Sequence, residues 1–192
     1  MTGQSLSLEE LPVVWRSAIL PRQYRPRGPL VEVHLVPAAP GTHHATPDLE
    51  RTRGELAESG FVGEQPVHAG SSEDGAWAFS TAGESGLAVL SSGQRTCWFP
   101  LPEESFDREA LALRVAARLT ALLAIGLPLP DALAPAIGLD PVAATTTVAT
   151  RSVRSPGRIR MGTVAAFPAD ELRRTAREIA EDLVARLAAP LS

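Results

Sequence analysis

Residues 86–125 constrain the fold more than any other part of the chain, because they combine two strand-like segments with a long amphipathic helix. The segments 86–91 and 95–101 are apolar and partly β-branched or aromatic, and the small and polar residues 91–94 between them are typical of a hairpin turn. The helix is predicted over 105–125, where apolar residues recur at steps of four, four and three: Leu111, Val115, Leu119 and Leu122. An isolated hairpin is marginally stable in water, so we expect the sheet to pack against this helix.

The rest of the chain supplies further elements of both kinds. Strands are predicted over 30–37, 76–81, 86–91, 95–101, 142–150 and 158–166. Helices are predicted over 46–59, 105–125 and 168–188. Consecutive strands usually pair, so the expected fold is α+β, with a mainly antiparallel sheet of five to six strands packed by three helices. We expect an N-terminal arm with a short helix over residues 1–29 and a single domain over 30–192.

Two segments read as connections between these elements. Residues 126–141 are apolar but rich in proline, which favours a connection packed over the core. Residues 155–157, Ser-Pro-Gly, predict the turn of a second hairpin between 142–150 and 158–166.

Strand alternation assigns directions to several side chains. Cys97 and Phe99 share one strand face, Trp98 points to the other, and Trp77 shares a face with Phe79 on the neighbouring strand. We expect these aromatic residues to lie in the core or at a contact surface. Cys97 is expected to be a buried structural thiol rather than a nucleophile.

Composition excludes several kinds of chemistry. All 18 basic residues are arginine, a bias typical of GC-rich genomes, and lysine is absent. A P-loop lysine and a Schiff base to pyridoxal phosphate are therefore excluded, and the single cysteine excludes an internal disulfide and a four-cysteine zinc site. The glycine spacing of residues 157–162 resembles a P-loop, but Thr163 stands in the lysine position. We predict no catalytic residue, no metal and no cofactor.

The pattern of hydrophobicity at the start of the chain indicates where the protein acts. Its first 15 residues carry acids where a signal peptide carries bases, and the longest apolar run, 119–129, is too short to span a membrane. We therefore expect a cytoplasmic protein that does not contact membranes.

The histidines are the residues that best support the alternative of a catalytic or ligand-binding site. Glu32 and His34 share a strand face, and a carboxylate beside an imidazole forms half of an acid/base site, with His68 as a further member. Two polar residues on one strand face more commonly mark its solvent side, and this is our first interpretation. His43 and His44 are adjacent in a loop, point apart, and have no suitably spaced further ligand.

Arginines cluster around the second hairpin. Residues 145–167 contain four arginines and no acid, whereas residues 38–110 carry a net charge of −8 within a chain of net charge −4. The predicted electrostatic contacts are Arg151, Arg154, Arg158 and Arg160, with Trp77 and Trp98 as further binding residues. One alternative is that these arginines only line a solvated strand edge. The other is that they recognise phosphate or nucleic acid.

The last helix, over 168–188, is amphipathic. Its apolar stripe steps by four, three, four and four along Leu172, Ala176, Ile179, Leu183 and Leu187. On the charged side, Arg174 with Glu178 and Asp182 with Arg186 have the spacing of ion pairs one turn apart.

The element order from residue 46 onward, a helix, three strands, a helix, two strands and a helix, resembles that of type III secretion chaperones and related small adaptors. Residues 158–172, RIRMGTVAAFPADEL, are similar to the end of type VII secretion chaperones from actinobacteria. The strand at 30–36 and the proline-rich arm before it depart from the smaller fold. These resemblances imply a chaperone-like protein that binds a partner and has no substrate chemistry.

We therefore expect a non-enzymatic protein-binding or adaptor domain, a homodimer or part of a larger assembly, that acts through an exposed sheet or helix face. One alternative is an enzyme or small-ligand protein with a pocket made by Glu32, His34 and His68. The other is a protein that binds nucleic acid or phosphate through arginines.

Overall fold

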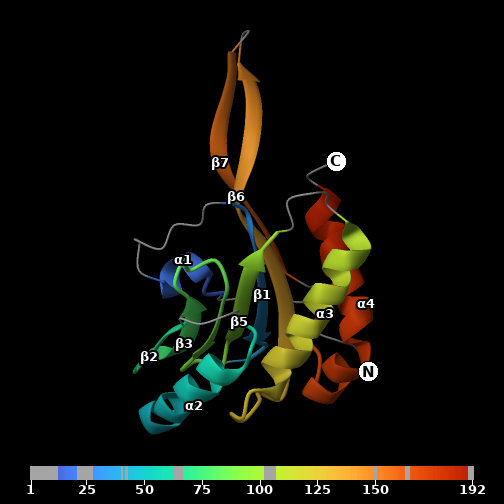
Figure 1. Ribbon diagram of the computed structural model, residues 1–192. Helices are drawn as coiled ribbons and strands as arrows, with labels where there is room; N and C mark the ends of the chain where they lie inside the picture. Colours follow the sequence, from blue (N-terminus) through green and yellow to red (C-terminus); the bar gives the residue numbers. More distant parts are fainter. Residues whose placement is uncertain are drawn as a thin grey trace.

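The computed structural model describes residues 13–20, 28–39, 41, 43–62, 67–101, 107–148, 151–162 and 165–189. Its centre is a seven-stranded antiparallel sheet in the order β2-β3-β4-β5-β1-β6-β7 (Figure 1). The strands are β1 (Leu30–Pro37), β2 (Val67–Ser72), β3 (Gly75–Ser80), β4 (Gly86–Leu90), β5 (Arg95–Pro100), β6 (Leu133–Val148) and β7 (Arg151–Gly162). Strand β1 thus lies in the interior of the sheet, between β5 and β6.

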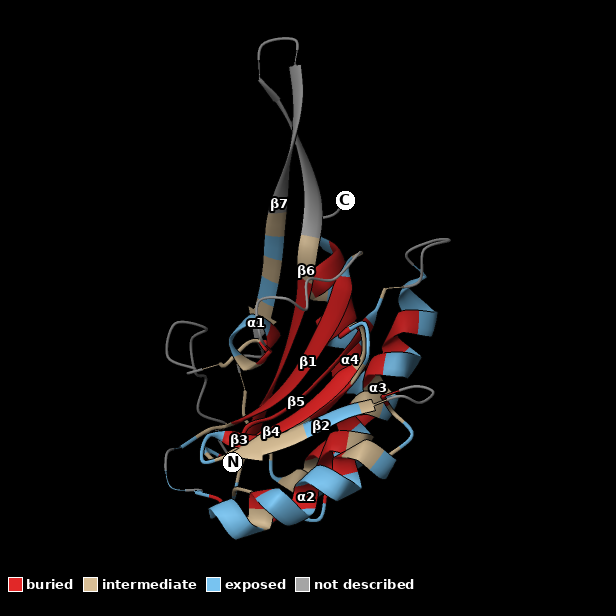
Figure 2. Ribbon diagram, turned by 60° about the vertical axis from the view of Figure 1, so that its left-hand side comes forward, coloured by how far each residue is buried: buried red, intermediate tan, exposed pale blue. Residues whose placement is uncertain are grey.

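The helices divide between the two faces of the sheet. The long ones, α2 (Thr46–Glu58), α3 (Arg108–Ala124) and α4 (Ala169–Ala188), pack on one face, and the short α1 (Arg16–Ile19) lies on the other (Figures 1 and 2). The main core forms beneath the long helices, where Val31, Leu87 and Phe99 meet Leu119 and Leu183. A smaller apolar cluster lies on the α1 side, as strand alternation requires. It consists of Leu20, Leu30, Phe79, Ala88 and Trp98.

The α+β class and the antiparallel sheet are confirmed, but the sheet has seven strands rather than five to six. The additional strand is β2, whose residues Val67–Ser72 are small and polar and give no apolar alternation. Trp98 and Phe99 lie on opposite faces, as predicted. The helices begin and end within three residues of their predicted bounds.

The second hairpin was predicted wrongly in extent. Strand β6 begins at Leu133, inside the segment expected to be a connection, and residues 155–157 lie within β7 rather than in a turn. Pro135 pairs with Leu35 of β1, but the ladder with β7 begins only at Ala136. Proline is tolerated at such an edge-like position, so the proline content of this segment did not prevent strand formation.

The outer part of this hairpin projects from the body of the molecule as an arm, residues 142–157 (Figure 1). It begins where the β6–β7 register shifts between Leu139 and Val142, next to the cis peptide bond Asp140–Pro141. At its base, Arg158 Nε lies 3.2 Å from Asp140 Oδ2. Within the arm, β6 and β7 stay paired through their backbones as far as Val148 and Arg151.

The start of α3 also differs from expectation. Residue 105, where the helix was expected to begin, lies outside the described residues, and α3 begins at Arg108. The N-cap position is held by Asp107, whose carboxylate accepts hydrogen bonds from the backbone N–H groups of Glu109 and Ala110 at 3.0 and 3.2 Å. The negative charge of this aspartate is also stabilised by the positive end of the helix dipole.

Candidate functional site

A buried polar cluster lies on the sheet face opposite the long helices. It consists of Arg16, Glu32, His34, Gln94 and Thr96, none of which is more than 4% exposed. His34 lies between two partners, with Nδ1 2.7 Å from Thr96 Oγ1 and Nε2 3.5 Å from Glu32 Oε2. The carboxylate of Glu32 also accepts a 2.9 Å hydrogen bond from the backbone N–H of Arg16. A carboxylate, an imidazole and a hydroxyl are therefore lined up on adjacent strands.

This cluster is covered by the segment 13–20, which we call the strap. The strap contains α1, and the ring of Trp15 meets the ring of His34 edge-on with 4.6 Å between their centroids. The expectation that Glu32 and His34 mark the solvent side of β1 was wrong: the side chains do share a face, but the strap buries that face. Period-2 alternation assigns a shared face and carries no information on what lies over it.

The electrostatics of the cluster favour an ionised carboxylate in a closed site. Burial raises the pKa of Glu32, but hydrogen bonding with and attraction by His34 and Arg16 outweigh it, so the pKa lies below its usual range. Glu32 and His34 are 1% and 0% exposed, so no substrate reaches them while the strap is in place.

His68 is not brought to this cluster. It lies on β2, four strands from β1 in the sheet order, where its ring packs 5.5 Å from that of Phe79. The three residues of the alternative acid/base site therefore do not converge. His43 and His44 do point apart, since His43 is exposed and His44 is buried.

The buried cation Arg95 is a functional-looking residue that sequence reasoning missed. Its guanidinium donates hydrogen bonds to the carbonyls of Leu122, Ile125 and Leu127 at 2.7, 3.0 and 2.5 Å. Leu122 lies in the last turn of α3, and the other two lie in the segment that directly follows the helix. Burial lowers the pKa of Arg95 to about 10, although Glu55 acts in the opposite direction. Arg95 therefore caps the end of α3. This structural role explains why an arginine is fully buried here without a role in substrate chemistry.

The aromatic residues and the cysteine fill the interior. Trp98 is 1% exposed and its Nε1 donates to the carbonyl of Gly83 at 3.0 Å, so of the two predicted binding tryptophans only Trp77 is partly exposed. Burial raises the pKa of Cys97 to about 12, with Arg118 acting weakly against it. At neutral pH the thiol of Cys97 is therefore protonated.

Two of the four predicted contact arginines already have partners within the chain. The guanidinium of Arg160 stacks 4.6 Å from the ring centre of Trp15, and Arg158 pairs with Asp140. Arg151 and Arg154 belong to the arm strand β7, and their side chains lie outside the described residues.

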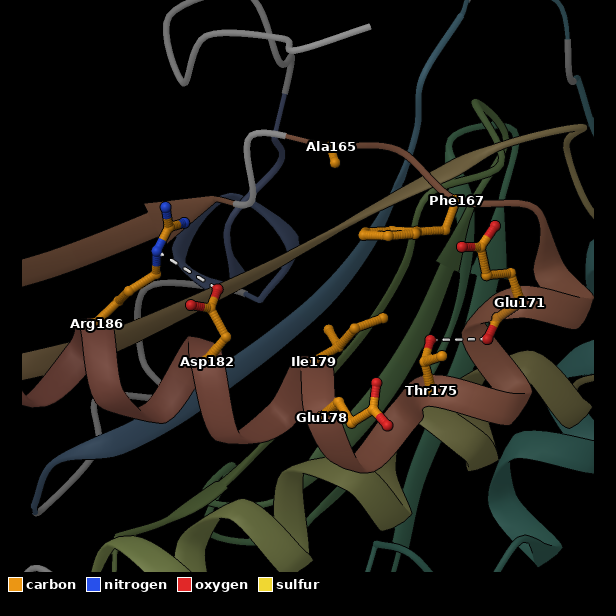
Figure 3. A pocket seen from close by; sticks show the side chains of 8 residues that line it. All are labelled: Ala165, Phe167, Glu171, Thr175, Glu178, Ile179, Asp182 and Arg186. Carbon is orange, nitrogen blue, oxygen red and sulfur yellow. Dashed lines mark hydrogen bonds and ion pairs between the residues drawn. The ribbon is translucent and has the colours of Figure 1, made fainter. Parts of the chain in front are cut away.

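An open groove of about 360 Å³ runs along α4, between this helix and the segment that follows β7. We call it the α4 groove; its lining residues are Ala165, Phe167, Glu171, Thr175, Glu178, Ile179, Asp182 and Arg186. Figure 3 shows Phe167 above α4 and the side chain of Ile179 on the side of the helix that faces Phe167, with the acidic side chains spread along α4. The groove therefore combines an apolar centre with a charged rim.

The rim of the α4 groove is acidic because its carboxylates are only partly neutralised. Asp182 pairs with Arg186 at 3.5 Å, whereas Glu171 and Glu178 have no cation within ion-pair distance in the described part of the chain. The predicted pairing of Glu178 with Arg174 does not form, because Arg174 Nε donates to the backbone carbonyl of Asp170 instead. Three carboxylates against one guanidinium give the groove a net charge of −2.

Within the described ranges, histidine, cysteine, aspartate and glutamate form no group of three that could hold a metal ion. No helix in the part of the chain that the structure describes has the length and apolar character needed to cross a membrane. Comparison with models of protein families, with curated proteins and with solved structures finds no match for this chain.

Proposed function

We propose that this protein is a non-enzymatic binding domain that holds a partner protein in the α4 groove. The partner would contribute a basic amphipathic helix. The observation that carries the proposal is the groove itself, in which Phe167 and Ile179 provide apolar surface beside the unneutralised carboxylates of Glu171 and Glu178.

The shape of the groove fits a helix as the occupant. The groove positions on α4, from Glu171 through Thr175, Glu178 and Asp182 to Arg186, step by four, three, four and four and so form one ridge along the helix. At 1.5 Å per residue this ridge is about 22 Å long, the length of a four-turn helix. A partner helix with arginine or lysine at the same spacing would place a cation opposite each free carboxylate.

The condition of the other candidate residues also supports a binding role. Glu32 and His34 are covered by the strap, Cys97 is buried and protonated, and Arg95 serves as a helix cap. Arg158 and Arg160 have partners within the chain, which weighs against recognition of phosphate by these two residues.

The test compares two double variants of the full chain. The groove variant carries Glu171→Gln and Glu178→Gln; the matched control carries Glu50→Gln and Glu58→Gln, which removes two exposed carboxylates from α2. Each exposed ion pair contributes about 0.2–1 kcal/mol, so the groove variant should bind its partner several-fold to about thirtyfold more weakly. The partner is recovered by affinity purification from the source lysate, and its affinity for each purified variant is then measured by calorimetry.

We expect the control to bind as the unaltered chain does and added salt to weaken binding by the unaltered chain. Equal binding by both variants would show that the partner does not bind in the α4 groove. Recovery of a clean monomer without a stoichiometric partner would contradict the proposed function as a whole.

A further inference from the structure

We propose that the sheet face beneath the strap is a polypeptide-binding site, and that the strap of a second copy of this chain can occupy it in place of the chain's own. The result would be a dimer with exchanged straps. This inference rests on the strap, residues 13–20, and is independent of the α4 groove.

The strap is held in part through its backbone. The side-chain amide of Gln94 accepts from the N–H of Val14 at 2.9 Å and donates to the carbonyl of the same residue at 2.6 Å. In this way the amide of Gln94 provides what a neighbouring strand would provide. Two residues further along the strap, the N–H of Arg16 donates to Glu32 Oε2 at 2.9 Å. These three bonds depend on backbone position and not on which chain supplies the backbone.

Between these backbone contacts the site selects an aromatic side chain. A Cβ atom at Gly138 would lie 2.5 Å from the indole of Trp15, so glycine at this position of β6 makes room for the ring. The ring of His34 contacts the indole edge-on, and the guanidinium of Arg160 stacks on it at 4.6 Å. Further along, Leu20 joins the apolar cluster that contains Trp98.

The strap site cannot be left empty without a large cost. Glu32, His34, Gln94 and Thr96 are each no more than 1% exposed, and loss of the strap would remove the backbone partners of Glu32 and Gln94. Unpaired polar groups in such a place are strongly unfavourable. Replacement of the strap therefore requires an occupant that makes the same contacts. The strap of a second copy makes them because it has the same sequence.

The length of the connection permits this exchange. Residues 21–28 join the strap to Pro29, which is anchored where its carbonyl accepts from the N–H of Leu101 at 2.9 Å. An extended chain of eight residues reaches roughly 25 Å, enough to deliver the strap to an adjacent copy. Reciprocal exchange gives a two-fold symmetric dimer in which both sites are filled.

A complementation experiment tests the exchange. Trp15→Ala damages the strap and leaves the site intact, whereas Gly138→Val blocks the site and leaves the strap intact. Neither variant can form a correct strap–site pair by itself, and each should lose docking by about a hundredfold, as expected for a large aromatic contact. A mixture of the two can form one correct pair, but only between chains.

Native mass spectrometry of the mixed full-length chains, refolded together from urea, should show a heterodimer about tenfold more abundant than the homodimer of either variant. The unaltered chain should form dimers in a concentration-dependent manner after the same treatment. Folded variants that yield no heterodimer would overturn the proposal and leave the strap as a purely intramolecular element.

If either variant fails to fold, a second pair applies the same logic to the backbone contacts. Val14→Pro removes the N–H that donates to Gln94, and Gln94→Ala removes the amide from the site. Their mixture should again enrich the heterodimer, and its absence would count against strap exchange. Neither outcome depends on the α4 groove, so the strap proposal and the proposed function fail separately.

Discussion

Arg95 and Leu122 are joined through the core by a 2.7 Å hydrogen bond, in which the guanidinium on β5 donates to a carbonyl near the C-terminal end of α3. The same guanidinium reaches the carbonyls of Ile125 and Leu127. A single side chain thus ties the orientation of α3 to the central strands. Arginine suits this position because its guanidinium donates from separate nitrogens in fixed directions, whereas a lysine ammonium donates from a single nitrogen.

Replacement of Arg95 should be among the most destabilising single changes in the chain. Arg95→Met would leave several buried carbonyls without donors and should lower the free energy of unfolding by about 2–4 kcal/mol. Arg173→Met, a change at an exposed cation near the same helix end, should shift it by no more than about 0.5 kcal/mol. Urea denaturation of both variants measures the difference, and equal midpoints would contradict the capping role of Arg95.

Two glycines with different surroundings should respond in opposite directions to alanine. A Cβ atom at Gly86 would lie 2.1 Å from the ring of Trp98, which is fixed by its bond to Gly83. Gly86→Ala should therefore destabilise the fold by about 1–3 kcal/mol or more through overpacking. Gly54, inside α2, has open space around its Cα, and Gly54→Ala should stabilise by about 0.5–1 kcal/mol. Thermal unfolding of the two variants would test both signs.

The ionised state of Glu32 makes part of the stability depend on pH. Because the pKa of Glu32 is lower in the folded chain than in the unfolded chain, the unfolded state takes up the proton first as pH falls. The contribution of Glu32 is present above about pH 4.3, the value for an unfolded glutamate, and is lost as pH falls through the folded pKa. Glu32→Gln should be destabilising at pH 7, and its difference from the unaltered chain should shrink below pH 4. A difference that stays constant down to pH 3 would show that Glu32 is not held as a carboxylate.

His44 should add a second loss of stability at a higher pH. Burial and the nearby charge of Arg95 lower the pKa of His44, against a smaller opposite effect of Asp48. The unfolded state therefore binds the proton more tightly, and stability falls as pH drops below about 6.5, the value for an unfolded histidine. His44→Gln should reduce the change in melting temperature between pH 7.5 and pH 5.5. An unchanged slope would assign that pH dependence to other groups.

Cys97 should be unreactive in the folded chain. With its pKa raised to about 12, the thiol has a far smaller thiolate fraction at pH 8 than an unfolded cysteine, by a factor of about a thousand. Labelling with a thiol-specific disulfide reagent should accordingly be slow in buffer and fast in urea. Rapid labelling of the native chain would show that the strand face carrying Cys97 opens frequently.

The arm should be dispensable for folding. Replacement of residues 142–157 by an Asn-Gly turn keeps the ladder in which Leu139 pairs with Ile159, at the base of the arm. We expect cooperative unfolding with a midpoint close to that of the unaltered chain, because the arm projects from the body (Figure 1). Circular dichroism and calorimetry would detect a loss of the fold, which would mean that the arm contributes to the core.

Local patterns predicted the elements that depend on local physics. Alternation placed Trp98 opposite Phe99, and the apolar stripe of α3 predicted the buried positions Leu111, Val115, Leu119 and Leu122. Both features follow from the geometry of one strand or one helix, which period counting describes directly.

Features that arise from contacts between distant segments were not predictable in this way. Whether Glu32 faces water depends on the strap, and whether Arg95 is needed depends on carbonyls about 30 residues away. Strand β6 forms across Pro135 because of its position relative to β7. The α4 groove likewise depends on Phe167, which comes from outside the helix that carries the charged residues of the groove.

The position of β1 between β5 and β6 affects how the chain folds during synthesis. During synthesis β1 is made before both of its neighbours in the sheet, and β5 and β6 follow only after about 60 and 100 further residues. Until β5 is made, both hydrogen-bonding edges of β1 and its apolar residues Val31, Val33 and Leu35 lack their final partners, and one edge stays unpaired until β6 follows. The nascent protein therefore exposes an apolar strand with unpaired edges during this interval, and its yield in cells should depend on the supply of holdase chaperones at the ribosome exit.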